Sequence, residues 1–174
     1  MIVIYTLGDA LDNHSAIALT SAANGGPWYF SWAEQANHHW FNAFVTKAGG
    51  WSKIYGRVMI PTQNDRNIIR INENNAYAWH QKNKGEYSFS NCAMWCYHLL
   101  EACNATEYES TLFWCLGDAW SPLALNSRAQ SIRENAIEKI GGLNSVQWPD
   151  RTDALRVFFA NEKACRKGAN WWVE

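Results

Sequence analysis

The chain lacks a membrane-spanning segment, a secretory signal and an excess of charge. No apolar run approaches the roughly 20 residues that a membrane-spanning helix needs. The opening segment, MIVIYTLGDALDNHS, has no basic start, apolar core or small-residue cleavage site. A net charge of −1 gives no general attraction to nucleic acid or an anionic membrane. We therefore expect a protein made in the cytoplasm, with no membrane span and no nucleic-acid partner, whose export would need a dedicated system.

Disulfide and metal patterns are also missing. The five cysteines are an odd number in a chain of this size, which does not suit a disulfide framework. Cys92 and Cys96 would share a helix face with His98 close by, but no second CxxC or HxxxH completes a tetrahedral site. The adjacent His38 and His39 would diverge on a helix. We expect no metal and no other cofactor.

The composition is that of a globular protein. Hydrophobic residues make up 48% of the 174 residues and charged residues 18%, with no repeat, linker or low-complexity segment. This predicts a single domain over residues 1–174 with its own core. The eleven tryptophans can serve packing or stack on sugar rings, and packing is the more common use.

Strands are expected in the N-terminal half and helices after them. Short β-branched or aromatic runs predict strands at MIVIYTL, HSAIALTS, WYFSW and YGRVMIP. The turn sequence ANGGP predicts that the second and third form a hairpin with a loop of four or five residues. Helices are predicted over 33–50, within 62–85, from Cys92, over 127–142 and over 148–168. This order indicates the α+β class.

Cys92 is the cysteine best placed for chemistry. Ser90 or Asn91 can cap a helix that has Cys92 in its first turn, where backbone N–H groups favour the thiolate. Cys96 and Cys103 lie further along that helix, where this effect has faded. From position alone, Cys92 is either a nucleophile or a small buried thiol that fills a gap in the core.

A cysteine nucleophile needs a base, usually a histidine held by a third group. His14 opens the apolar strand HSAIAL, where a rigid element would fix its side chain. A solvated histidine after a turn is the alternative interpretation. Asp12, two residues earlier, could orient the ring only through a turn.

Five short motifs occur together in a recognisable order: HSAIAL, YFSW, VMIP, AYAWHQ and YSFSNCAMWCYHLL, between residues 12 and 104. The chain thereby resembles circularly permuted members of the papain-like NlpC/P60 superfamily, in which a histidine opens an early strand and Asn-Cys later begins a helix. It resembles in particular the cysteine-peptidase-like domains of bacterial type VI secretion effectors. More distantly, it is similar to the lecithin:retinol acyltransferase-like group.

The resemblance implies a permuted papain-like domain, in which a small antiparallel sheet packs against the Cys-bearing helix and further helices follow. It implies a catalytic set of Cys92 as nucleophile, His14 as base and Ser31 as third residue, with Asp12 and Asn91 as possible supporting residues. For Asn91, a helix cap is the simpler role. A secreted antibacterial amidase or endopeptidase is implied, acting on peptidoglycan peptides in the target-cell periplasm, with an immunity protein and a secretion-system carrier as partners.

Two other functions stay open at this stage. The same dyad could transfer an acyl or amide group to a lipid or amine, or deamidate a protein. The fold could instead be a non-catalytic module that binds glycan or peptide through its tryptophans.

Overall fold

The computed structural model describes residues 1–8, 13–20, 28–31, 54–62, 68–83, 91–114 and 121–148. The helix expected over 33–50 and almost all of the one expected over 148–168 lie outside these ranges, as does Asp12.

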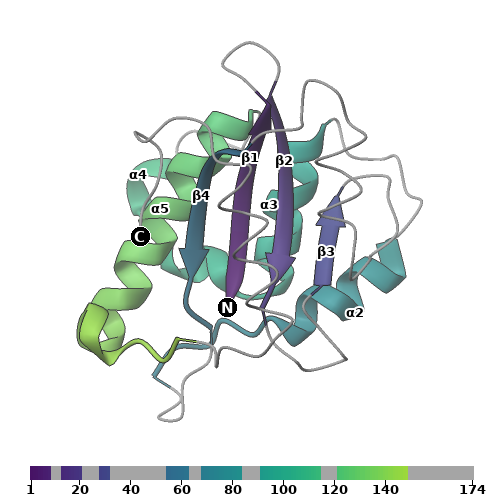
Figure 1. Ribbon diagram of the computed structural model, residues 1–174. Coiled ribbons are helices and arrows are strands. Elements are labelled where there is room, and N and C mark those ends of the chain that lie inside the picture. The colour runs from purple at the N-terminus through teal and green to yellow at the C-terminus, as the bar shows by residue number, and fades with distance from the viewer. Residues whose placement is uncertain are drawn as a thin grey trace.

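Four antiparallel strands form one sheet in the order β3-β2-β1-β4 (Figure 1). The strands are β1 (Ile2–Gly8), β2 (Asn13–Leu19), β3 (Trp28–Ser31) and β4 (Ile54–Ile60). Each falls on a β-branched or aromatic run, because such side chains pack well on a pleated surface. The four predicted strands are therefore confirmed.

The pairing of β2 with β3 is confirmed, but the predicted loop of four or five residues is wrong. The pair ends at Leu19 and Trp28, so residues 20–27 connect the strands. The backbone N–H of Thr20 donates to the carbonyl of Met1 at 3.0 Å, and the Thr20 hydroxyl donates to the same oxygen at 3.3 Å. Thr20 is thus bound to the start of β1, and it does not extend the ladder with β3.

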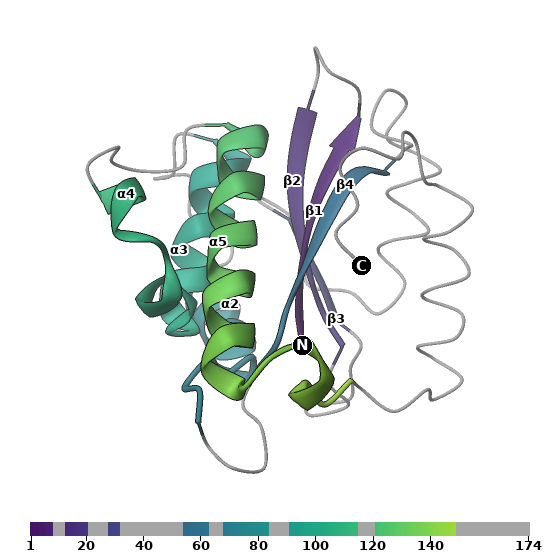
Figure 2. The same cartoon turned by 90° about the vertical axis from the view of Figure 1, so that its left-hand side faces the viewer.

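Among the described residues, the longer helices are α2 (Asn74–Asn83), α3 (Cys92–Ala102) and α5 (Pro122–Ile140). Shorter turns lie at η3 (Ala105–Tyr108), α4 (Thr111–Trp114) and η4 (Leu143–Ser145). α3 and α5 cover one face of the sheet (Figure 2). In the described ranges, no helix combines the length and apolar character needed to cross a membrane.

The predicted helix over 127–142 has the expected end but an earlier start. Gly141 ends α5 with φ at 107°, a conformation that suits glycine. The helix begins at Pro122 because the Ser121 hydroxyl accepts a 3.1 Å hydrogen bond from the N–H of Ala124. Proline at the first helical position is also favourable.

Alternate residues of the strands fill two cores, one on each face of the sheet. The core beneath α3 and α5 takes seven strand residues: Ile2, Ile4, Ile17, Leu19, Phe30, Val58 and Ile60. The second core takes the other row, including Val3, Tyr5, Leu7, Ala16 and Ala18. The fold is mixed, with a small antiparallel sheet and several helices, which confirms the α+β class.

Among the tryptophans whose side chains the structure describes, three take part in packing. Trp28 lies 5.0 Å from Tyr77, and Trp79 lies 5.4 Å from Trp95, between ring centroids. Trp148, in contrast, is 45% exposed. Packing accounts for the first three, as aromatic contacts of this kind stabilise a core.

Candidate active site

Cys92 is the first residue of α3, as the sequence predicts. Asn91 precedes it in extended conformation, and its side chain accepts a 2.9 Å hydrogen bond from the N–H of Met94. The carbonyl of Asn91 also accepts the first helical bond, from Trp95, at 3.1 Å. Asn91 is therefore the helix cap, and Cys92 lies among the unpaired N–H groups of the first turn.

The strand that carries His14 lies against this helix start. The backbone N–H of Ser15 donates to Sγ of Cys92 at 3.4 Å. This bond joins residues 77 positions apart in the sequence and places His14 next to the residue that contacts the sulfur. The N–H groups of Cys92 and Ala93 also favour the thiolate form.

The sulfur lies beside the edge of β2. In an extended strand, side chains leave above and below the sheet, whereas N–H groups point sideways to neighbouring strands. At this level β1 occupies one edge of β2, because Thr6 is paired with Ser15. The sulfur that accepts the Ser15 N–H therefore lies on the other edge, next to the last described β2–β3 pair, Ala16 with Ser31.

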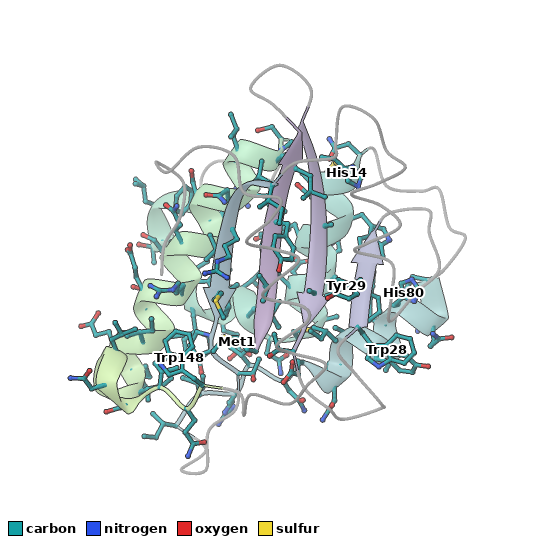
Figure 3. The ribbon with its side chains drawn as sticks, in the orientation of Figure 1. Met1, His14, Trp28, Tyr29, His80 and Trp148 are labelled. Carbon is teal, nitrogen blue, oxygen red and sulfur yellow. The ribbon has the colours of Figure 1, made fainter. Side chains whose placement is uncertain are left out.

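His14 and Ser15 leave β2 on opposite faces. Ser15 shares the face of its partner Thr6, whose hydroxyl accepts a hydrogen bond from Asn126 on α5. His14 shares the face of its partner Leu7, which packs in the second core. The contacts described at Sγ of Cys92 come from Ser15 and from the start of α3. Figure 3 shows His14 at the end of the sheet where β2 begins.

The surroundings of Cys92 disfavour its thiolate. Burial raises the pKa of the thiol, and this effect outweighs that of the N–H groups of Ser15, Ala93 and Cys92 and of the nearby Ser15 hydroxyl, which lower the pKa. A preformed thiolate is therefore disfavoured, and the proton must be removed as the sulfur reacts. Cys92 remains partly exposed, so a reagent can reach it.

A buried polar row was not expected from the sequence. Ser15 and Thr6 are fully buried neighbours on adjacent strands, in rows otherwise filled by isoleucine and leucine. Asn126 donates through Nδ2 to the Thr6 hydroxyl at 3.5 Å, and Gln130 donates through Nε2 to Oδ1 of Asn126 at 3.1 Å. The sequence signal that could have indicated this row is the polar residue in each apolar row, Thr6 in β1 and Ser15 in β2.

The proposed third residue is placed only by its backbone. Ser31 ends β3 opposite Ala16, so its position is a diagonal neighbour of His14 on the next strand. The other proposed supporting residue, Asp12, lies outside the described residues.

The remaining described cysteines and histidines have other surroundings. Cys96 and Cys103 are fully buried; burial raises the pKa of Cys96 well above its usual value and that of Cys103 to about 12. His80 is buried between Phe30 and Trp95, with ring centroids at 4.9 and 6.0 Å. It lies well away from His14 in Figure 3.

No group of three or more His, Cys, Asp or Glu side chains in the described ranges could hold a metal ion. Scans against protein-family models, curated proteins and solved structures return no match to this chain. The geometry of the site is therefore the basis for its chemistry.

Proposed function

We propose that the chain is a cysteine hydrolase, of the amidase or endopeptidase type, with Cys92 as nucleophile and His14 as general base. The observation that carries the proposal is the 3.4 Å hydrogen bond from the Ser15 N–H to Sγ of Cys92. It joins a partly exposed thiol at a helix start to the strand residue that follows a histidine. The strand of His14 and the helix start of Cys92 are thus in contact, and the proposal adds that the imidazole reaches the sulfur.

The neutral thiol favours a mechanism with proton transfer during attack. His14 takes the proton of Cys92 as the sulfur forms a bond with an amide carbonyl carbon, and the carbonyl oxygen becomes negatively charged. The N–H groups at the start of α3 stabilise that charge. The imidazolium then gives its proton to the leaving amine, and a thioester remains on Cys92.

Water completes the cycle. With His14 again acting as base, a water molecule attacks the thioester carbonyl, the carbon–sulfur bond breaks, and the sulfur recovers its proton. In this scheme Ser31, on the strand beside His14, orients the imidazole, and Asn91 acts through the helix cap. Asp12 is a further candidate for orienting the ring.

The order of motifs supports a permuted papain-like fold of the NlpC/P60 type. In this proposal the protein is an antibacterial effector that reaches a target periplasm through a type VI secretion carrier, cuts peptidoglycan peptides and is held in check by an immunity protein. The central position of the histidine strand and the packing of the Cys-bearing helix beside it are compatible with such a fold.

The test is incubation with purified peptidoglycan, with the products read by mass spectrometry. We expect new peptide fragments from the wild type and none from Cys92→Ala or His14→Ala. Cys96→Ala is the matched control, because it removes a buried thiol one turn along the same helix and should leave cleavage intact.

Two results would contradict the proposal. Cleavage that survives in Cys92→Ala would remove Cys92 from the chemistry. Absence of cleavage by every variant, with product formed only when an amine or lipid acceptor is added, would identify a transferase.

A further inference from the structure

The side chain of Ser15 is in an unusual place for a hydroxyl. It is fully buried on the face of β2 that packs against the helices, in a row continued by Ile17 and Leu19. In the described part of the chain, Oγ of Ser15 makes no hydrogen bond of ordinary geometry. A buried hydroxyl without a partner is costly, so such a position is a candidate for a functional role.

The nearest chemistry is the sulfur of Cys92. The N–H of Ser15 already donates to this sulfur at 3.4 Å, and the Ser15 hydroxyl is close enough to favour the thiolate over the thiol. A thiol is a weak acceptor, whereas a thiolate accepts strong, charge-assisted bonds. The hydroxyl thus has little to bind in the resting state and a strong acceptor once the sulfur ionises.

The partner strand is held in place from α5. Thr6, opposite Ser15, accepts from Nδ2 of Asn126 at 3.5 Å, and Oδ1 of Asn126 accepts from Gln130 at 3.1 Å. Asn126 is fully buried, so its amide is fixed by these two contacts. These hydrogen bonds connect α5 to Thr6, and Thr6 is paired with Ser15. They therefore help to hold β1 and β2 in place where Ser15 contacts Cys92.

We propose that Ser15 is a positioning residue for Cys92, whose hydroxyl donates a hydrogen bond to the sulfur as the proton leaves. This deepens the proposed function, since it rests on Cys92 as the nucleophile. Such a bond stabilises the charged sulfur more than the neutral thiol. It therefore lowers the activation barrier of the attack by Cys92 and does not merely strengthen the binding of substrate in the ground state. Thr6 and Asn126 support the arrangement.

The test is the pH dependence of Cys92 alkylation by iodoacetamide in the folded, full chain. The extent of reaction is read on the Cys92 peptide by mass spectrometry, so no substrate is needed. Ser15→Thr and Ser15→Val are nearly identical in shape and suit a strand equally well, and only the first retains the hydroxyl. Ser15→Ala is the third variant, and Thr20→Ala is the control that removes another buried hydroxyl.

We expect Ser15→Thr and Thr20→Ala to follow the wild-type profile. In Ser15→Val and Ser15→Ala, the inflection of the alkylation rate against pH should shift upward by about one pH unit. At pH values below the inflection, this makes alkylation about tenfold slower. Cys96 on α3 interacts electrostatically with Cys92, and His14 precedes the residue that contacts the sulfur; every variant retains both groups. The shift can therefore be assigned to the hydroxyl.

Coincident profiles for Ser15→Thr and Ser15→Val would overturn the inference, whatever the peptidoglycan assay shows. Conversely, a shift in Ser15→Val with no cleavage by the wild type would leave the inference standing and reject the proposed hydrolase. If Ser15→Ala fails to fold, as judged by circular dichroism, the isosteric pair still decides the question.

Discussion

The hydroxyl of Tyr97, on α3, donates a 3.0 Å hydrogen bond to Oε2 of Glu109, the residue that follows η3. This bond is buried. Nε of Arg128 lies 3.4 Å from the other oxygen of that carboxylate, and its guanidinium carbon lies 5.0 Å from the centre of the Tyr97 ring. All three side chains are buried. This cluster joins the Cys-bearing helix to α5 through a charge pair that is removed from water.

Removal of the charge on Glu109 should destabilise the fold strongly. Glu109→Gln leaves Arg128 buried without its counter-charge, and breaking a buried pair in this way costs about 3–5 kcal/mol. Glu101→Gln is the control, since it removes an exposed pair with His98 and should cost less than about 1 kcal/mol. Urea unfolding measures both, and equal losses would show that the buried pair is not special.

Loss of the helix cap should affect both stability and the thiol. Asn91→Ala removes the acceptor for the Met94 N–H and should lower the free energy of unfolding by about 1 kcal/mol. Ser121→Ala removes the matching cap of α5 and should cost a similar amount. Only Asn91→Ala should also slow the alkylation of Cys92, because only that cap fixes the helix start beside the sulfur. An unchanged alkylation rate in Asn91→Ala would show that the cap does not affect the reactivity of Cys92.

Alkaline pH should destabilise the protein through Cys103. Burial raises the pKa of this thiol from about 9 to about 12, so the folded state holds the proton after the unfolded chain has lost it. The free energy of unfolding is then unaffected below pH 9 and falls as the pH rises toward 12. Unfolding experiments at pH 8 and 10.5 should show a smaller fall for Cys103→Ala than for the wild type. The same fall in both proteins would exclude Cys103 as the cause.

The pH profile of wild-type Cys92 distinguishes two mechanisms. Because burial raises the pKa of this thiol above its ordinary value near 9, alkylation should rise throughout the neutral range and level off only above pH 9. A preformed thiolate–imidazolium pair would instead react fully in mildly acidic solution. A plateau below pH 7 would therefore contradict proton transfer during attack.

Most of the described elements follow from local sequence. The four strand runs were recognisable because both faces of the sheet are buried, which makes the runs almost continuously apolar. The start of α3 was recognisable because Asn91 is a good cap before an apolar helix pattern. The early start of α5 was missed, although Ser121 and Pro122 are typical of a helix start.

Only part of the candidate site could be predicted from local sequence. The sequence pointed to Cys92 and His14, and the structure brings their elements together through the residue after His14. Ser15 itself was overlooked, because its role depends on the register with Thr6 and on the packing of α5. Such contacts are tertiary, so neither spacing nor propensity predicts them. The positions flagged for orienting His14 remain predictions.

The bond between Ser15 and Cys92 also bears on the order of assembly. β1 and β2 follow one another in the chain and close a short loop, whereas the sulfur contact joins residues 77 positions apart. Loop-closure entropy grows with separation, so the short pairing is the cheaper to form first. The thiol therefore acquires these neighbours only when the distant halves of the chain have met.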